Sequence, residues 1–233
     1  MLRRYRRFQA SFLRTAAARL FPARLPQRTP RLLCTAVVAA ALVYSASCRH
    51  DDSNTSPTGP ATPTVPELTS VPYETADDAW ISARYTPEHQ GIDLSARKDI
   101  PIRAMGRGVF RKKMYYHPGV PRWQVNADII VGDYAIACLF EPGDSVTEAQ
   151  ADTQYARLIA DGTPVKSGDL LGTLYLAPGQ EHSIFHFGVY KTTTATGQAE
   201  CPMPYCSPEV RNALLNLYRR DNPGGQICFD HIY

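Results

Sequence analysis

Three residues of the sequence carry side chains that together could bind a metal ion. His89 and Asp93 are separated by three residues, with Gly91 between them, and His186 follows far downstream. Imidazole nitrogens and carboxylate oxygens are common zinc ligands, and a catalytic zinc takes three protein ligands and keeps one position open for water. If the two stretches meet in the fold, they supply the donors of such a site. A lone strand histidine is more commonly a structural side chain, and this alternative stays open for His186.

The elements that must position these residues are predicted to be mostly strands. Alternation of apolar residues and turn signals predicts strands at 101–104, 108–110, 125–131, 134–140, 170–176 and 184–190. Gly132 and Asp133 form a two-residue turn that makes a hairpin of the third and fourth strands. In the last strand, Phe185, Phe187 and Val189 should face the core, and His186 should share the opposite face with Ile184.

One convincing helix closes the chain. Residues 208–219 carry an apolar stripe, with Ser207 as the N-cap and Pro208 in the first turn. Residues 144–156 are polar and suit either a loop or a short helix. We therefore predict an all-β domain, with an antiparallel β-sheet core and a C-terminal helix.

Charge is distributed unevenly along the chain. Residues 1–31 hold nine arginines and no acidic residue, the next 17 residues are uncharged, and residues 48–233 have a net charge of −6 (16 basic against 22 acidic residues). A basic segment before an apolar segment is typical of an export signal. The basic pI therefore comes from the N-terminus and is no argument that the folded part binds nucleic acid.

This pattern predicts three regions: a signal or membrane-anchor segment at 1–47, a disordered Pro-, Thr- and Ser-rich tether at 48–75, and a folded domain at 76–233. Ser45–Cys48 resembles a bacterial lipobox, which makes Cys48 the candidate for lipidation, although Ser45 departs from the usual Leu. An uncleaved membrane anchor is the alternative. In both cases the folded domain is expected to be exported, periplasmic and membrane-anchored, as a lipoprotein in the first case.

Cysteines of an exported domain are expected to oxidise. Cys201, Cys206 and Cys228 surround the predicted C-terminal helix, so we expect a disulfide among them that fixes the tail. A structural zinc site built from these cysteines and His231 is a less favoured alternative. Cys138 lies in a predicted strand and is expected to be a buried thiol.

The order of several motifs resembles the LytM/lysostaphin-type zinc endopeptidases. The motifs are His89-x-Gly91-Ile92-Asp93-Leu94-Ser95-Ala96, Pro101-Ile102-Arg103-Ala104, Gly108-Val109, Val165-Lys166-Ser167-Gly168-Asp169-Leu170-Leu171-Gly172 and Phe185-His186-Phe187-Gly188-Val189. They extend from about residue 89 to residue 190. The resemblance implies an antiparallel β core, Zn²⁺ held by His89, Asp93 and His186, and action on the peptide cross-bridges of peptidoglycan.

The sequence lacks two histidines that serve proton transfer in that family. The family has a histidine two residues before the last zinc ligand, and this chain has Ile184 there. A second family histidine, in the strand that ends the central hairpin, has no counterpart in the run 137–142. Losing general acid–base help costs about 10²–10⁴-fold in rate. His182 and Glu141 are the candidate replacements, with an exposed loop histidine and a solvated turn carboxylate as the alternatives.

Two functions follow from these observations. The chain is either a zinc metallopeptidase-like protein that cleaves peptidoglycan stem peptides, or a catalytically impaired relative that binds the cell wall or regulates another cell-wall hydrolase. Whether it is an enzyme stays open at this point, because the metal ligands are present and the family's catalytic histidines are absent. A structural envelope lipoprotein without a metal is a third possibility.

Overall fold

The structure is a computed structural model that describes residues 65–192 and 199–229. The predicted signal or anchor segment, the lipidation candidate Cys48, most of the predicted tether and His231 lie outside the described residues. Among the described residues, no helix is both long enough and apolar enough to cross a membrane.

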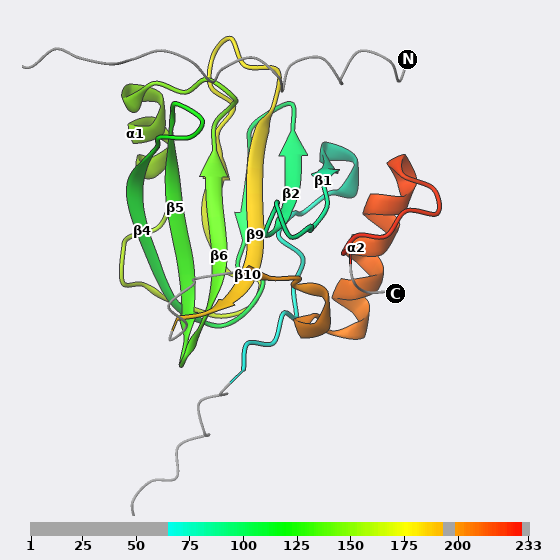
Figure 1. Ribbon diagram of the computed structural model, residues 1–233. Helices are drawn as coiled ribbons and strands as arrows, with labels where there is room; N and C mark the ends of the chain where they lie inside the picture. The colour runs from blue at the N-terminus through cyan, green and yellow to red at the C-terminus, as the bar shows by residue number, and fades with distance from the viewer. Residues whose placement is uncertain (1–64, 193–198, 230–233) are drawn as a thin grey trace, which may run out of the picture. The chain divides into compact units, whose positions relative to one another are not determined.

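The described residues form an antiparallel β fold with a C-terminal helix, which confirms the predicted fold class (Figure 1). The main sheet has the strand order β1-β2-β9-β6-β5-β4-β7, and the short β10 also pairs with β9. Its strands are β1 (Ala79–Ala83), β2 (Ile92–Ala96), β4 (Gly108–His117), β5 (Arg122–Val131), β6 (Tyr134–Glu141), β7 (Pro164–Val165), β9 (Ser183–Lys191) and β10 (Ala199–Glu200). A second sheet pairs β3 (Ile100–Arg103) with β8 (Leu170–Leu174).

The hairpin of β5 and β6 turns at Gly132, whose φ of 57° suits a glycine. Strand β6 then pairs with β9, and β9 pairs with β2, so two segments about 90 residues apart in sequence lie side by side in the middle of the sheet. This crossing of the chain is what makes a site from distant residues possible.

One face of the main sheet forms the core. On β9, the side chains of Phe185, Phe187 and Val189 are fully buried, as the alternation predicts. Matching positions on the neighbouring strands complete this layer: Phe110, Val125, Ala127, Ile129, Ile136, Cys138, Phe140, Ile92 and Leu94. The opposite face, which carries His186, is therefore left for polar groups.

Two α-helices in the described part of the chain flank the sheet. Helix α1 (Glu148–Ala156) starts with a capping box between Thr147 and Gln150. Of the loop and the short helix that the sequence allows for residues 144–156, the structure therefore has the helix. Helix α2 (Pro208–Asp221) has Ser207 as its N-cap, as predicted, and buries Val210, Leu214, Leu215, Leu217 and Tyr218. It lies beside β1 (Figure 1).

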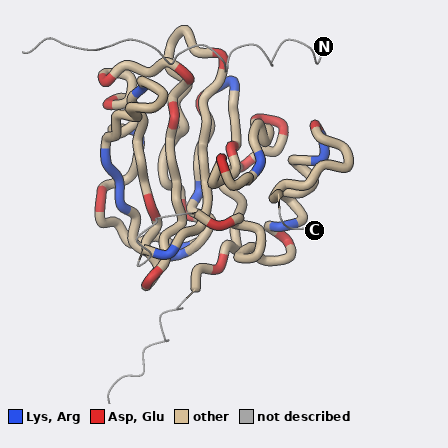
Figure 2. Tube along the Cα trace, viewed as in Figure 1, with Lys and Arg blue, Asp and Glu red and all other residues tan. Residues whose placement is uncertain are grey.

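Strand β4 is longer than the sequence predicts. Its middle holds the consecutive basic residues Arg111, Lys112 and Lys113, visible as one blue stretch in Figure 2. The Nζ atom of Lys112 donates to the carbonyl oxygens of Tyr155 and Leu158, at the end of α1. A basic side chain thus fits the helix-covered side of the strand because the last carbonyls of the helix accept its protons.

The folded part begins before residue 76, the predicted boundary. Leu68 is fully buried, Tyr73 is nearly so, and the backbone N–H of Leu68 donates to the carbonyl of Tyr205 at 2.9 Å. The predicted tether therefore extends too far at its C-terminal end: residues 67–73 pack against the domain because they carry apolar side chains that the Pro- and Thr-rich stretch before them lacks.

Candidate metal centre

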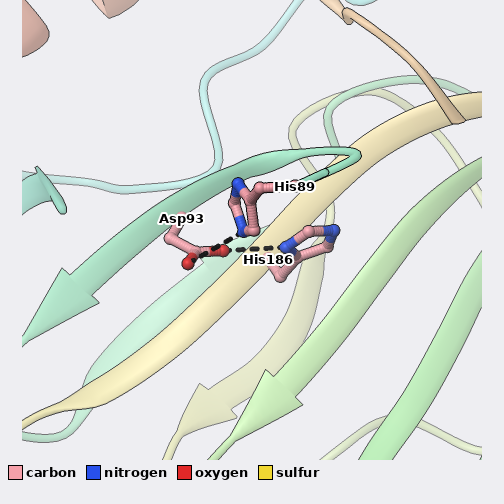
Figure 3. Close-up of side chains that lie close together, drawn as sticks. All are labelled: His89, Asp93 and His186. Carbon is pink, nitrogen blue, oxygen red and sulfur yellow. Dashed lines mark hydrogen bonds and ion pairs between the residues drawn. The ribbon is translucent and has the colours of Figure 1, made fainter. Parts of the chain in front are cut away.

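Strand pairing brings the three predicted ligands together. Asp93 on β2 is the direct register partner of His186 on β9. His89 lies in the loop just before β2, four residues ahead of Asp93, and its ring reaches over the same carboxylate (Figure 3). The side-chain donors of the three residues all lie within 4.8 Å of one another. The predicted convergence of His89, Asp93 and His186 is therefore present, and metal binding itself stays a prediction.

The spacing of the donor atoms suits a tetrahedral metal ion. Nδ1 of His186 lies 2.8 Å from Oδ1 of Asp93, and Nε2 of His89 lies 3.1 Å from Oδ2 of the same residue. The two imidazole rings meet edge to face, with centroids 4.9 Å apart. Zinc–ligand distances of about 2.0–2.1 Å place tetrahedral ligands roughly 3.3 Å apart. Small movements would therefore convert this hydrogen-bonded cluster into a metal site.

The backbone selects the tautomer of His89 that a metal needs. Nδ1 of His89 lies 3.0 Å from the carbonyl oxygen of Arg84, which can only accept a proton. Nδ1 must therefore carry the hydrogen, and in the neutral ring Nε2 keeps its lone pair directed at the cluster. The loop turn is fixed locally, because Thr86 and His89 exchange backbone hydrogen bonds and Thr86 Oγ1 accepts from the N–H of His89.

A glycine makes room for the second imidazole. A Cβ atom on Gly91 would lie 2.2 Å from Nε2 of His186 and 2.3 Å from its Cε1. The His186 ring therefore packs directly over the backbone of Gly91. This close approach gives the glycine of the His89-x-Gly91-x-Asp93 pattern a steric role that its place in the motif alone does not reveal.

The electrostatics of the three residues favour a shared positive charge. Burial alone would raise the pKa of Asp93, but hydrogen bonds from His186 and His89 outweigh it and lower that pKa to about 2. The hydrogen bond to Asp93 raises the pKa of His89, against the effect of burial. The carboxylate is therefore ionised at neutral pH and attracts a cation between the rings, either a proton or a metal ion.

The positions next to His186 carry no proton-transfer group. On β9, Ile184 is 9% exposed and pairs with Ser95 of β2 and Glu141 of β6. Across from His186 on β6 stands Leu139. Aliphatic side chains can neither accept a proton nor donate a hydrogen bond, so the groups immediately beside His186 do not replace the family's histidines.

His182 does not join the cluster. Its Nε2 atom lies 3.9 Å from Oδ1 of Asp144, and its ring packs near Trp80, with centroids 6.1 Å apart. Its contacts thus connect it to the loop after β6 and to β1. His182 thus lies in the loop before β9, as its alternative interpretation has it, but its side chain is only 26% exposed.

Glu141 is buried, so it is not the solvated carboxylate that was its alternative interpretation. It is only 6% exposed and pairs with the guanidinium of Arg122 on β5. Burial raises its pKa, Arg122 opposes that effect, and the charges of Asp93, His186 and His89 also act on it. Glu141 is thus a fixed, buried acid on the polar face, electrostatically coupled to all three ligands.

Arg122 is the residue of this region that the sequence does not single out. Its side chain is mostly buried, with 16% exposed, and its Nε atom is buried without a hydrogen-bond partner among the described residues. Pro121 and the turn before it interrupt the alternation of apolar residues. The predicted strand therefore starts at residue 125, three residues after β5 begins at Arg122. Extending the pairing of the 134–140 strand backwards places Gln124 opposite Glu141 and Arg122 two residues further along the same face of β5.

The cysteines of the tail form one disulfide. Cys201 is bonded to Cys228, and Cys206 is a buried free thiol, as is Cys138. The expected tail disulfide is therefore present in the structure, and Cys206 is the candidate that it leaves out.

Comparison with known proteins gives a limited result. No protein-family model and no curated protein matches the sequence. Among solved structures, the chain is similar to the solution structure of lysostaphin, with a TM-score of 0.42, 15% identity and coverage of 70% of this chain and 62% of that one. The antimicrobial peptidase lysostaphin from Staphylococcus simulans gives a TM-score of 0.40 and 16% identity, with 70% and 58% covered. At this level the likeness concerns the chain trace and gives no information about ligands or activity.

Proposed function

We propose that this chain is an exported, membrane-tethered, LytM-type zinc metallopeptidase-like protein that acts on the peptide cross-bridges of peptidoglycan. The observation that carries the proposal is the convergence of His89, Asp93 and His186 from two neighbouring strands and one braced loop. The motifs that surround these residues in the sequence support the same family. The basic and apolar N-terminus and the Cys201–Cys228 disulfide support export, because disulfides persist in oxidising compartments.

The donor set fits Zn²⁺. Two imidazoles and one carboxylate are a common ligand set of catalytic zinc, and the three side chains leave the fourth position to water. Bound zinc would lower the pKa of that water and polarise a carbonyl group of the substrate. The chain's own contribution is to hold the ligands in place: Asp93 and His186 are in register on paired strands, and the Arg84 carbonyl orients His89.

Glu141 is the residue we assign to proton transfer. It lies on β6, two residues after Leu139, which pairs with His186. Its side chain is therefore on the same polar face of the sheet as the ligands. A raised pKa makes a buried carboxylate a better base near neutral pH, and Arg122 fixes its orientation. Because the aliphatic residues Ile184 and Leu139 stand next to His186, we expect hydrolysis to be slow.

A second function is favoured by those same aliphatic residues. With Ile184 in place of a proton-handling group, the site can bind a metal and a peptide carbonyl without turning the substrate over efficiently. The protein would then bind the cell wall or regulate another hydrolase. The two functions share the metal site and differ in whether Glu141 acts on bound substrate.

The decisive experiment measures metal content and hydrolysis together. The purified protein is analysed for zinc and incubated with purified peptidoglycan, with and without a chelator, and the released muropeptides are separated. Chelator-sensitive release that falls about 10²–10⁴-fold in Glu141→Gln, with unchanged zinc content, supports the enzyme. Zinc binding with no release supports the second function. Absence of zinc from the protein loaded with excess metal refutes both.

The matched control for Glu141→Gln is His182→Ala. His182 contacts Asp144 and Trp80 and not the cluster, so this variant should retain both zinc content and the native rate of release. A loss of hydrolysis in His182→Ala with normal zinc content would transfer the proton-transfer role to that histidine.

A further inference from the structure

We propose that the Cys201–Cys228 disulfide and residues 226–229 form a clamp that positions His89 for metal binding. The tail and the loop that carries His89 are joined directly by hydrogen bonds, and the disulfide connects this tail to the strand that pairs with the His186 strand. The inference rests on the proposed metal site and assigns a role to residues outside it.

The tail pairs with the start of the His89 loop. The backbone N–H of Tyr85 donates to the carbonyl of Ile227 at 3.0 Å, and the N–H of Phe229 donates to the carbonyl of Tyr85 at 3.1 Å. On the neighbouring residue, Nη1 of Arg84 donates to the carbonyl of Gln226 at 3.3 Å, and its guanidinium lies over the Phe229 ring, 5.8 Å from the centroid. These contacts hold Arg84 and Tyr85 against residues 226–229 of the tail.

The residue held in this way is the one that orients the ligand. The carbonyl of Arg84, whose carbon forms the peptide bond to the N–H of Tyr85, accepts the hydrogen bond from Nδ1 of His89. Because a peptide unit is planar, the tail's bond to the Tyr85 N–H and the Arg84 carbonyl belong to one rigid group. The tail therefore fixes the acceptor that selects the tautomer and direction of the His89 ring.

The other end of the disulfide is fixed to the second ligand strand. Cys201 directly follows β10, where Ala199 and Glu200 pair with Tyr190 and Val189 of β9. The carbonyl of Ala199 accepts from the Tyr85 hydroxyl at 3.1 Å, and its N–H donates to the side chain of Gln90, next to His89, at 3.4 Å. The disulfide thus links the segment beside the His186 strand to the segment beside the His89 loop.

The disulfide adds a covalent restraint to a tail whose Ile227 side chain is also fully buried. Cys201 and Cys228 lie 27 positions apart in the sequence, and α2 ends at Asp221, followed by Asn222-Pro223-Gly224-Gly225. A glycine-rich segment of this kind has high conformational freedom. Closing the loop with a covalent bond restricts the positions of residues 226–229 and keeps their donors and acceptors opposite Tyr85.

The test compares the native protein with the double variant Cys201→Ser/Cys228→Ser. The matched control is Cys206→Ser, which changes a buried cysteine of the same tail region without touching the disulfide; burial raises the pKa of that thiol to about 12, so it is also a poor exchange partner. Zinc affinity is measured by competition with a chromophoric chelator. Amide hydrogen exchange of the Tyr85 and His89 N–H groups is measured in the metal-free proteins.

The clamp predicts two changes in the double variant. Exchange at the Tyr85 and His89 amides accelerates while the β9 amides stay protected, and zinc affinity falls about 10–100-fold, the loss typical of removing an outer-shell partner. Cys206→Ser shows neither change. Unchanged exchange at Tyr85 and His89 overturns the clamp, and so does accelerated exchange with zinc affinity within twofold of the native value.

The exchange measurement keeps the clamp separate from the metal site. If the native protein binds no zinc, the proposed function fails, and the amide exchange of the loop still decides whether the tail positions it. If the double variant does not fold, Phe229→Pro keeps the disulfide and removes the N–H that donates to the Tyr85 carbonyl. It should weaken zinc binding in the same direction, and native affinity in Phe229→Pro overturns the clamp.

Discussion

Replacing Gly91 by alanine should disable the metal site while leaving the sheet intact. The added Cβ would lie 2.2 Å from Nε2 of His186, whereas ordinary contacts to such an atom begin at 3.4 Å. Gly91 needs no positive φ, so the substitution brings no backbone strain, and the whole effect is the collision with one imidazole ring. The ring must move by roughly 1 Å or rotate away, because the neighbouring backbone of Gly91 cannot yield without breaking the strand pairing that follows it.

The expected magnitude follows from what the ring then loses. Overpacking a filled site costs about 1–3 kcal/mol, and the hydrogen bond between His186 Nδ1 and Asp93 is among the contacts at risk. Metal–ligand distances must be met to within about 0.2 Å, so a displacement of roughly 1 Å removes His186 as a ligand. Zinc affinity should therefore fall by more than the roughly 10–100-fold seen when only an outer-shell partner is lost.

The assay pairs urea unfolding in excess chelator with zinc titration by chelator competition. Gly119→Ala is the control, because Gly119 is exposed in the loop between β4 and β5 and its added Cβ would meet only the His117 side chain, at 3.2 Å. That variant should match the native protein in both measurements. Zinc affinity of Gly91→Ala within threefold of the native value would refute the steric role of Gly91 and the position of the His186 ring.

Three further expectations test the site from other directions. His186→Ala should abolish zinc binding, and unchanged zinc content in that variant would remove the metal-site proposal. Zinc at about 100 times its Kd should raise the free energy of unfolding by about 2.7 kcal/mol, and excess chelator should remove this gain in thermal or urea unfolding. In the metal-free protein, the pKa of Asp93, about 2 against an ordinary 3.8, contributes about 2 kcal/mol that is present above pH 4 and lost as the pH falls towards 2. The raised pKa of His89 has the opposite sign: its contribution is complete below the ordinary 6.5 and is lost as the pH rises through the folded value. Urea unfolding across pH should therefore show a maximum between these limits, and a metal-free stability that still rises steadily above pH 7 would contradict the His89 shift.

The sequence predicts most of the sheet because its core strands follow simple alternation. Phe185, Phe187 and Val189 alternate with polar or small residues, and the structure buries all three. The alternation predicts a shorter β4 than the structure has, because three consecutive basic residues interrupt it. The structure accommodates Lys112 by tertiary contacts, since the carbonyls at the end of α1 accept its protons. Periodicity within one segment contains no information about such a partner.

The ligands of the candidate site can also be predicted from the sequence, but the groups that position them cannot. The ligand types and their order are visible in the sequence and the family resemblance implies that they converge, whereas the register of Asp93 with His186 comes from the structure. The role of Gly91 and of the Arg84 carbonyl depends on backbone approach, which residue types do not encode. The tail contacts to Tyr85 depend on a disulfide whose pairing among three candidates cannot be deduced from spacing.

Metal binding and proton transfer are carried by different parts of this fold. The ligands depend on the β2–β9 register and on the loop before β2, so they can persist whatever occupies β6. The proton-transfer group depends on β6, where the residue facing His186 is Leu139 and the next on that face is Glu141. Removing one partner of a buried ion pair costs about 3–5 kcal/mol, so Glu141→Gln should also lower the free energy of unfolding, and its zinc content and rate are compared in the folded variant. The buried acid on the ligand face supports the hydrolase, whereas Ile184 and Leu139 beside His186 support the binding protein. Hydrolysis that does not respond to Glu141→Gln would therefore weaken the assignment of Glu141 and leave the metal site intact.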